Sequence, residues 1–201
     1  MHNVVIRRGA PEDSEDFSRL MLLTGEDLYT GILGKDAGIV LGRLFKEKRN
    51  YFSYEHSYFM EMDGEVAGMT LLYDYKTTKT EFFRFGFLIF KYMKLSFFRY
   101  IIPLLRAGRV LNGSREGDLH SSNSALYPKF RAQGLGERLF GIAEEKARRE
   151  GFRRIVVSVK YDNIAALSLR KKLGYKVEME LPPLDLENGV FKHLQLVKDI
   201  I

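Results

Sequence analysis

A glycine turn between an apolar run and an amphipathic helix constrains the fold of this chain more than any other feature. The run Leu126-Tyr127-Pro128 leads into Arg131-Ala132-Gln133-Gly134-Leu135-Gly136. Glycines between a strand and a helix let the backbone approach a ligand, and the free N–H groups at the helix start face an anion. The turn therefore predicts a phosphate-binding loop, although a plain strand-to-helix turn that holds two glycines would read the same way.

The residues after this turn have helical periodicity. Glu144 and Glu145 each stand four positions before an arginine, which places these pairs on an exposed side. Gly151 stands where a C-terminal cap is expected. The spacing predicts a helix that begins at the turn, ends near Gly151 and buries one apolar face, formed by Leu135, Leu139, Ile142, Ala143 and Ala147.

Two well-known phosphate loops are excluded by spacing. A Walker loop needs Gly-x-x-x-x-Gly-Lys-Ser/Thr, and this string does not occur. A Rossmann turn that began at Gly134 would need its third glycine where Leu139 stands. The pattern that remains is Arg-x-x-Gly-x-Gly after a strand.

A second block of sequence follows the predicted helix. The β-branched run 154–160 predicts a strand. Asn163 then stands at a favourable helix N-cap position, and a short apolar segment ends at Leu173-Gly174-Tyr175. The two blocks together predict strand, loop, helix, strand and helix in succession.

In these two blocks the chain resembles the GNAT superfamily of acetyl-CoA-dependent N-acyltransferases. The loop 131–136 with its Pro128 lead-in matches the loop of that family that binds coenzyme A pyrophosphate, and Asn163-x-x-Ala166 to Tyr175 follows in the family's order and distance. The resemblance implies an α/β (α+β) fold with a mixed, mostly antiparallel central sheet flanked by helices. It also implies transfer of an acetyl group from acetyl-CoA to a primary amine of a small molecule or peptide.

The resemblance assigns the coenzyme site residue by residue. Residues before the turn would hydrogen-bond the pantetheine arm through their backbone, and residues of the turn would meet the pyrophosphate. Arg131 would be a phosphate ligand or a brace for the loop, and Asn163 would face the coenzyme arm or act only as an N-cap. The expected coenzyme residues are Ser124, Ala125, Leu126, Arg131, Ala132, Gln133, Gly134, Leu135, Gly136, Glu137 and Asn163.

The catalytic acid departs from the family pattern. Many relatives carry a tyrosine seven residues after the Asn163 position, and its hydroxyl protonates the leaving thiolate; this chain has Arg170 there. An arginine is not a proton donor near neutral pH. Arg170 would therefore stabilise thiolate charge, point to solvent, or give way to another group through a local shift.

His120 is the candidate general base. Alternation along the predicted strand 118–126 places Asp118 and His120 on one face with positions 122, 124 and 126. An imidazole titrates near neutral pH, but a purely structural histidine is the interpretation that the sequence slightly favours. Glu55 and Glu61 are further carboxylates without distinguishing spacing, and we expect His193 to be structural. The four histidines lack metal-ligand spacing, so we expect no metal.

One segment is longer than in a compact GNAT domain. About forty residues, roughly 78–116, precede the fourth predicted strand, and residues 82–115 contain seven basic and no acidic side chains among many aromatics. This insert predicts one or two helices, broken near Ser96 and Pro103. It would complete the core as an added helical layer, cover the acceptor pocket as a lid, or contact a membrane surface. We favour the first of these interpretations, and contact with a membrane is the least favoured of the three.

The remaining chain predicts strands at 4–8, 57–62, 65–75, 176–181 and 191–199, with helices near 10–16 and 36–48. Its 201 residues suit one acyltransferase domain. The absence of cysteine excludes disulfides, thiolate zinc sites and a cysteine nucleophile. The net charge of +6 suits a polyanionic ligand, and no motif that reads nucleic acid is present. Without a leader-like or transmembrane segment, we expect a cytoplasmic protein. A coenzyme-binding regulatory or scaffold module with little catalysis is the alternative function.

Overall fold

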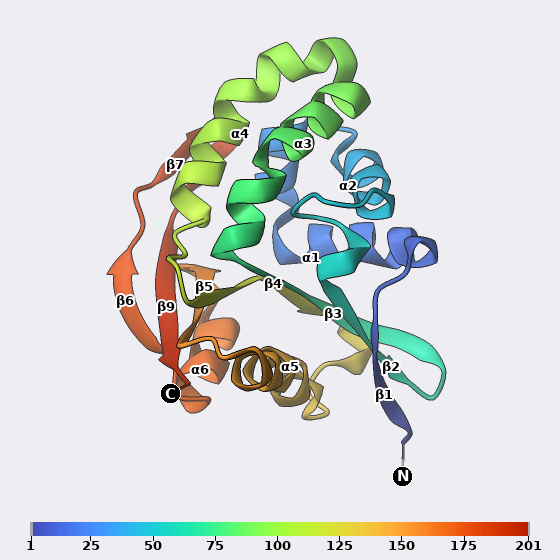
Figure 1. Ribbon diagram of the computed structural model, residues 1–201, viewed down its shortest axis with the longest axis vertical. Coiled ribbons are helices and arrows are strands. Elements are labelled where there is room, and N and C mark those ends of the chain that lie inside the picture. The colour runs from blue at the N-terminus through green and yellow to red at the C-terminus, as the bar shows by residue number, and fades with distance from the viewer. Residues whose placement is uncertain (1, 201) are drawn as a thin grey trace.

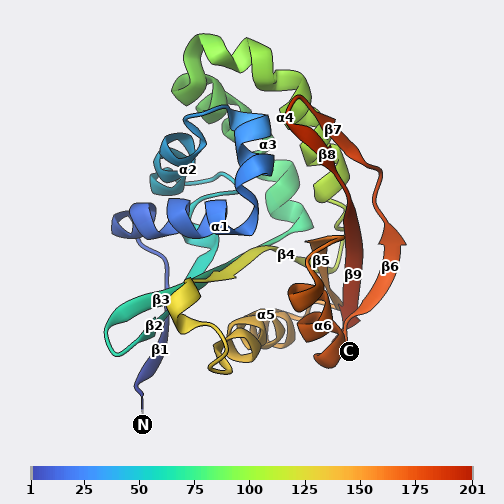
Figure 2. The same ribbon diagram turned by 180° about the vertical axis from the view of Figure 1, so that it is seen from behind.

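The computed structural model describes residues 2–200 and is built around one seven-stranded sheet (Figures 1 and 2). The neighbouring strands are antiparallel except for one parallel pair in the middle, β4 and β5. The predicted mixed, mostly antiparallel sheet flanked by helices is therefore confirmed. In spatial order the strands are β1 (Val4–Arg8), β2 (Ser57–Met62), β3 (Glu65–Asp74), β4 (Asp118–Leu126), β5 (Arg154–Lys160), β9 (His193–Asp199) and β6 (Lys176–Glu180).

Helices cover both faces of this sheet, and alternation along the strands separates the core into two parts. On one face, Phe59 and Leu71 pack with the first four helices; on the other, Met60 and Leu72 pack with the last two. A short hairpin of β7 (Leu184–Leu186) and β8 (Gly189–Phe191) lies beside α4. The helices are α1 (Ser14–Leu33), α2 (Ala37–Lys46), α3 (Tyr75–Met93), α4 (Phe97–Leu111), α5 (Leu135–Glu150) and α6 (Ile164–Lys172).

α5 has the predicted extent and the predicted buried face. It begins at Leu135, directly after the glycine turn, and Gly151 ends it in a left-handed conformation with φ +74°. The five apolar residues expected to share a face are all buried. The glycine turn therefore lies at the N-terminus of a helix of 16 residues, long enough to present a full dipole at the loop.

β4 is irregular in a way that the sequence pattern did not predict. Leu71 pairs with Asn123 whereas Leu72 pairs with Ser121, so Ser122 forms a bulge. The bulge exchanges the two faces of the strand. His120 faces Tyr73 on the α1 side, while Leu126 packs on the α5 side. The expectation that residues 118, 120, 122, 124 and 126 share one face is therefore wrong.

β4 and β5 also diverge soon after they meet. Their pairing covers only Asp118–His120 opposite Arg154–Val156. Within residues 2–200, no other strand pairs with the β5-facing edge of residues 121–126, and the gap opens toward the glycine turn (Figure 1). A polar backbone edge thus leads from the bulge to the start of α5.

The insert is a helical hairpin formed by α3, a short 3-10 helix at Lys94–Ser96, and α4. It begins at Tyr75, earlier than predicted, because the Asp74 carboxylate caps α3 by accepting a hydrogen bond from the Thr77 N–H at 2.7 Å. The predicted break near Ser96 is confirmed, but the one at Pro103 is wrong because α4 continues through it to Leu111. α4 packs against α1 and β7, and this packing outweighs the hydrogen bond that proline cannot donate.

None of the helices within residues 2–200 is long and apolar enough to cross a membrane.

Candidate active site

The glycine turn presents free backbone donors at the start of α5. Ala132 and Gly134 have left-handed conformations, with φ of +60° and +75°. Within the described chain, no hydrogen bond is donated by the backbone N–H groups of residues 132–135. Uncommitted N–H groups at a helix N-terminus attract anions because they add to the positive end of the helix dipole. The predicted anion-binding character of the loop thus has a structural basis in its backbone.

Two residues of the motif have structural contacts of their own. The Arg131 Nε donates to the Leu126 carbonyl at 3.2 Å, so this side chain braces the loop. A Cβ atom added to Gly136 would lie 3.0 Å from Leu169 Cδ2 on α6. Glycine at 136 therefore allows α5 and α6 to approach closely, whereas glycine at 134 is favoured because its backbone is left-handed.

The other expected coenzyme residues lie around the gap between β4 and β5. Ser124, Ala125 and Leu126 form the end of the unpaired β4 edge, where the Ser124 hydroxyl bonds that of Thr70 at 2.8 Å. Asn163 is exposed just after β5, and its side chain caps α6 by accepting from the Ala166 N–H at 3.1 Å. Two more expected residues are held by neighbours, because Gln133 donates to the Lys129 carbonyl and Glu137 pairs with Lys172.

Arg170 points into the protein and not to solvent. Its side chain is 3% exposed, and its Cζ lies 3.6 Å from the centre of the Phe140 ring and 4.8 Å from that of Tyr175. Its Nη2 lies 3.4 Å from the Ser121 hydroxyl, next to the bulge, and its Nη1 has no hydrogen-bond partner. No carboxylate of residues 2–200 forms an ion pair with it, and burial lowers the pKa of the guanidinium. Arg170 is thus a buried cation beside the bulge that forms no ion pair within residues 2–200, and Glu144 acts on it only at longer range.

His120 lies on the opposite face of β4, under α3. Its ring is fully buried 5.1 Å from that of Tyr73, and its Nδ1 has no hydrogen-bond partner. Burial lowers the pKa of His120 to about 4, against a smaller raising effect of the Asp118 carboxylate. The imidazole is therefore neutral at pH 7 and has an uncommitted ring nitrogen.

The buried state of His120 predicts a pH dependence of stability. The unfolded chain binds a proton below about pH 6.5, whereas the folded protein does not bind it until the pH approaches about 4. Native stability is expected to fall as the pH decreases through this window, by about 2–3 kcal/mol at pH 4.5 from this residue. Urea unfolding of the wild type and His120→Gln at pH 7 and 4.5 measures the effect. Equal losses in both proteins would contradict it.

Sequence reasoning missed a group of buried polar side chains on the α1 side of the bulge. Asn123 Nδ2 donates to Tyr29 Oη at 2.8 Å, and Tyr73 Oη donates to Asn112 Oδ1 at 3.0 Å. Burial raises the pKa of Tyr73 to about 12 and that of Tyr29 further. The polar position 123 within a strand is the only trace of this group in the sequence, because its partners come from distant segments.

The remaining candidates are committed to other contacts. Glu61 pairs with Arg7 at 2.5 Å on the outer strands β1 and β2, and Glu55 accepts from the Arg49 N–H. His193 is buried in β9 opposite Lys160. Within residues 2–200, no group of three or more histidine, aspartate or glutamate side chains is arranged to hold a metal ion.

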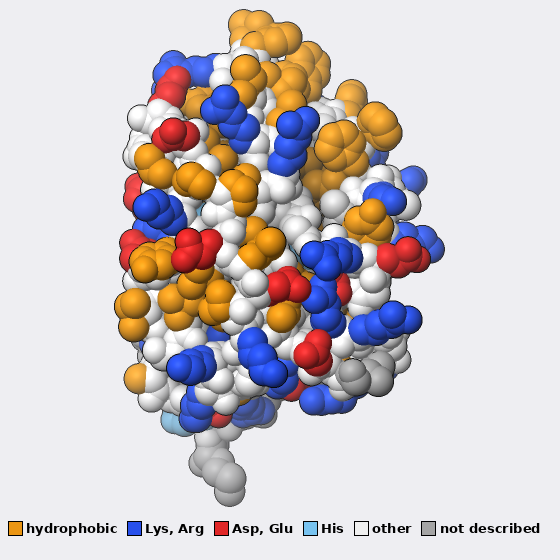
Figure 3. Space-filling model, turned by 90° about the vertical axis from the view of Figure 1, so that its left-hand side faces the viewer, with side chains coloured by type: hydrophobic (Ala, Val, Ile, Leu, Met, Phe, Trp, Pro, Cys, Tyr) orange, Lys and Arg blue, Asp and Glu red, His pale blue; other side chains and the backbone are white. Residues whose placement is uncertain are grey.

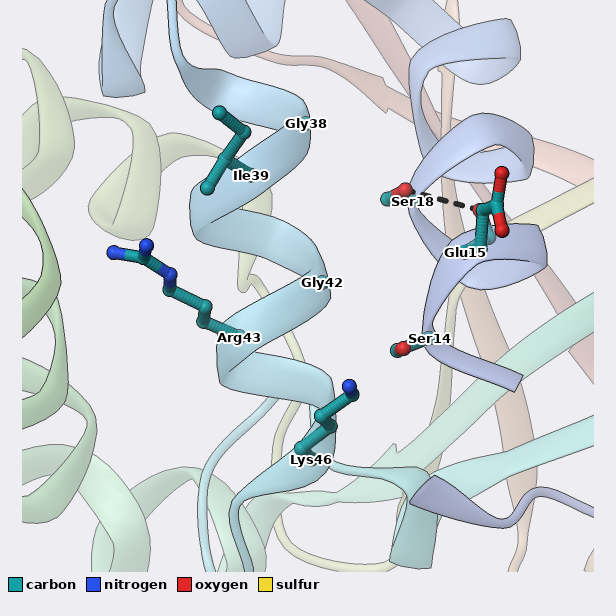
Figure 4. Close-up of a pocket in the computed structure, with 8 residues that line it drawn as sticks. All are labelled: Ser14, Glu15, Ser18, Gly38, Ile39, Gly42, Arg43 and Lys46. Atoms are coloured by element: carbon teal, nitrogen blue, oxygen red, sulfur yellow. Dashed lines mark hydrogen bonds between the residues drawn. The ribbon is translucent and has the colours of Figure 1, made fainter. Parts of the chain in front are cut away.

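The hollows on the surface of residues 2–200 include the following two. One of about 280 Å³ separates α1 from α2 and lies away from β4 (Figure 4); its lining includes Glu15, Arg43 and Lys46. The other, about 290 Å³, is bordered by Asp27 of α1, the β5 end at Lys160–Asp162, and residues 188–192. The lining of the second hollow includes Lys160, the last residue of β5, so this hollow lies at the end of β5 that has diverged from β4.

The strand β4, the turn with free backbone donors and the helix α5 follow one another as the resemblance to the GNAT superfamily implies. A family model described as "Acetyltransferase (GNAT) family" matches residues 35–175. The protein belongs to this family of acetyltransferases, which confirms the resemblance seen in the sequence.

Solved structures share the fold at low sequence identity. An acetyltransferase crystal structure is 18% identical with a TM-score of 0.67, covering 98% of this chain and 100% of that one. An N-acetyltransferase from Staphylococcus aureus Mu50 is 19% identical with a TM-score of 0.63, covering 95% and 99%. A Bacillus subtilis acetyltransferase in complex with CoA is 16% identical with a TM-score of 0.56, covering 100% of both chains. The search among curated sequences finds no relative.

Proposed function

We propose that residues 1–201 form one acyltransferase domain that moves an acetyl group from acetyl-CoA to a primary amine by direct attack. The continuity between the unpaired β4 edge and the free N–H groups of the glycine turn carries this proposal. Coenzyme A has an extended arm with amide groups that is linked to a pyrophosphate. The arm matches the strand edge, and the pyrophosphate matches the glycine turn. The strand edge hydrogen-bonds amides, and the helix N-terminus binds the anion.

The residues divide the binding task between them. The backbone of Ser124 to Leu126 is available to pair with the amides of the pantetheine arm as an added strand would. The N–H groups of residues 132–135 serve the pyrophosphate, and Arg131 keeps their loop in place through Leu126. Exposed Asn163 retains free amide hydrogens for the same arm while it caps α6.

In the reaction, the amine nitrogen forms a bond to the thioester carbonyl carbon, and the carbon–sulfur bond breaks. The attacking amine loses a proton, and the departing thiolate carries negative charge. The Arg170 side chain reaches β4 from the α6 side. Its fixed positive charge stabilises the negative charge of the departing thiolate without transferring a proton. The thiolate then takes its proton from water.

The ring of His120 and the buried Tyr29 and Tyr73 lie on the α1 side of β4. The neutral imidazole is in the state needed to accept the amine's proton, so we keep His120 as the candidate base. Because its pKa is low, His120 is a weak base. It accepts the proton only once the amine nitrogen has begun to bond to the carbonyl carbon and has become more acidic. The amine would therefore approach from the α1 side and acetyl-CoA from the α6 side.

Thiol release in a panel of amines tests the proposal. The protein is incubated with acetyl-CoA and, in separate reactions, amino acids, polyamines and peptides with free N-termini. Amine-dependent release of CoA thiol, with an acetylated product of matching mass, is the expected result. Binding of acetyl-CoA without thiol release from any amine would favour the alternative, a coenzyme-binding module that lacks an acid at position 170. Failure to bind acetyl-CoA would contradict both.

A further inference from the structure

The helical hairpin of α3 and α4 has two different faces. Its inner face is buried against the body of the protein through Leu88, Ile89, Met93 and Ala107. The interpretation of the insert as a layer that completes the core holds for this face only. Its outer face, which we call the hairpin face, exposes eight large apolar side chains: Phe82, Phe83, Phe87, Phe90, Leu95, Phe98, Ile102 and Leu105.

These side chains form two helical stripes that meet at the turn of the hairpin. Phe83, Phe87 and Phe90 follow each other at helical spacing, and Phe98, Ile102 and Leu105 do so on α4. Leu95 stands in the turn with 85% of its surface exposed, and Phe83 is 84% exposed. Figure 3 shows hydrophobic side chains gathered at the end of the molecule that this turn forms in Figure 1. A patch of this kind on a folded protein marks a contact surface.

Basic side chains stand at the other end of the same stripes. At 100° per residue, Lys76 and Lys79 continue the α3 stripe toward its start, and Arg109 continues the α4 stripe toward its end, with Arg106 at its flank. Within residues 2–200, Arg106 and Arg109 form no ion pair, and residues 82–115 contain no acidic side chain. The hairpin face thus has an apolar tip and a cationic base, and Arg106 and Arg109 at this base have no ion-pair partner within residues 2–200.

We infer that the hairpin face is a docking surface for a membrane that contains anionic lipid. Apolar and aromatic side chains enter the boundary between headgroups and acyl chains, while lysines and arginines bind lipid phosphates at the level above it. The order from tip to base matches this sequence of layers. The protein would bind at the membrane surface without crossing it, and both α3 and α4 would contribute anchoring side chains.

Other occupants fit this surface less well. Within residues 2–200, no segment covers this surface, because its eight apolar side chains are exposed there. A second copy related by a two-fold axis would bring identical surfaces together. The cationic base would then face either the cationic base or the apolar tip of the other copy, and neither offers an acidic side chain. The inference concerns membrane contact alone and does not depend on the acetyl transfer proposed above.

A single-tryptophan variant tests insertion directly, because the chain contains no tryptophan. Phe87→Trp places the reporter on the hairpin face, and Ile164→Trp places an exposed reporter on α6 as the matched control. With vesicles of phosphatidylcholine and phosphatidylglycerol, the emission of Phe87→Trp is expected to shift to shorter wavelength and that of Ile164→Trp to stay unchanged. With pure phosphatidylcholine the shift should be smaller, because the cations gain nothing from a neutral surface.

Vesicle flotation separates the apolar and charged contributions. The variant Phe83→Ser/Phe87→Ser/Leu95→Ser/Phe98→Ser should bind anionic vesicles at least about tenfold more weakly than the wild type. The variant Arg106→Glu/Arg109→Glu should lose about tenfold or more, and most of its preference for anionic lipid. The control Ile39→Ser/Val177→Ser/Val190→Ser changes exposed apolar residues elsewhere and should bind as the wild type does. Unchanged circular dichroism and thermal unfolding establish that each variant is folded.

Three results would overturn the inference. The first is wild-type protein that stays unbound with anionic vesicles at low salt. The second is equal binding by the wild type and the two hairpin variants. The third is a dimer in analytical ultracentrifugation that the serine variant alone converts to monomer, together with no vesicle binding, because it would assign the hairpin face to self-association.

Discussion

Gly134→Asp is expected to weaken acetyl-CoA binding by about 50-fold or more relative to Gly134→Asn. Aspartate and asparagine have the same shape, and both tolerate the left-handed backbone that position 134 requires, with φ +75°. They differ in charge, and a carboxylate beside a bound pyrophosphate costs several kcal/mol of binding free energy. Isothermal titration calorimetry of both variants measures the difference. Equal affinities would show that no anion binds at this turn.

The space around Gly134 makes a second matched pair available. Neither Gly134 nor Gly141 of α5 has a heavy atom within 4 Å of an added Cβ, so the two alanine variants differ in backbone conformation alone. Gly134→Ala should lose about 1 kcal/mol of stability because alanine is strained there. Gly141→Ala should gain about 0.5–1 kcal/mol, because alanine favours the helix interior. Denaturant unfolding at fixed pH measures both, and it also shows whether the loop variants remain folded for the calorimetry.

Arg170→Met is expected to slow acetyl transfer by about 100-fold while it makes the ligand-free protein more stable. Loss of a fixed charge at the leaving group lowers turnover by about this factor. The same side chain is a buried cation without a carboxylate partner, so an apolar side chain of similar length should stabilise the fold by about 1–4 kcal/mol. In Arg170→Met, steady-state kinetics should therefore show a lower turnover, and thermal unfolding should show a higher melting temperature.

Two further variants make the Arg170 experiment decisive. Lys171→Met removes the neighbouring, exposed cation of α6 and should leave both turnover and stability near the wild-type values. Arg170→Tyr introduces the residue that many relatives carry and should restore part of the turnover, with a new acidic limb in the pH–rate profile. Unchanged turnover and unchanged acetyl-CoA affinity in Arg170→Met would remove Arg170 from the mechanism.

The elements that could be predicted from the sequence are those with strong local signals. Asp63-Gly64 marks the turn of the β2–β3 hairpin, the β-branched run 154–160 became β5 with the same bounds, and the apolar spacing after Leu135 became α5. In each case a turn residue or a periodic pattern alone specifies the local conformation. The glycine turn belongs to this group, because its requirement for a left-handed glycine is also local.

The bulge at Ser122 could not be predicted, since residues 121–124 read Ser-Ser-Asn-Ser and a polar run has no alternation that defines which residue faces which side. The helix break predicted at Pro103 was wrong for a related reason. A proline signals a helix break locally, but α4 is held by contacts with α1 and β7 that are distant in the sequence. The surroundings of Arg170 and His120 depend on such distant contacts as well. Their burial, and the loss of solvation that follows from it, could therefore not be predicted from the sequence.

The brief contact between β4 and β5 has a mechanical consequence. Three register pairs join the four strands β1–β4 to the three strands β5, β9 and β6, so the sheet consists of two plates that meet along a short seam. A ligand arm that hydrogen-bonds along the open edge lengthens that seam. The stiffness of the whole sheet, and the angle between its plates, are thereby coupled to the occupancy of one narrow gap.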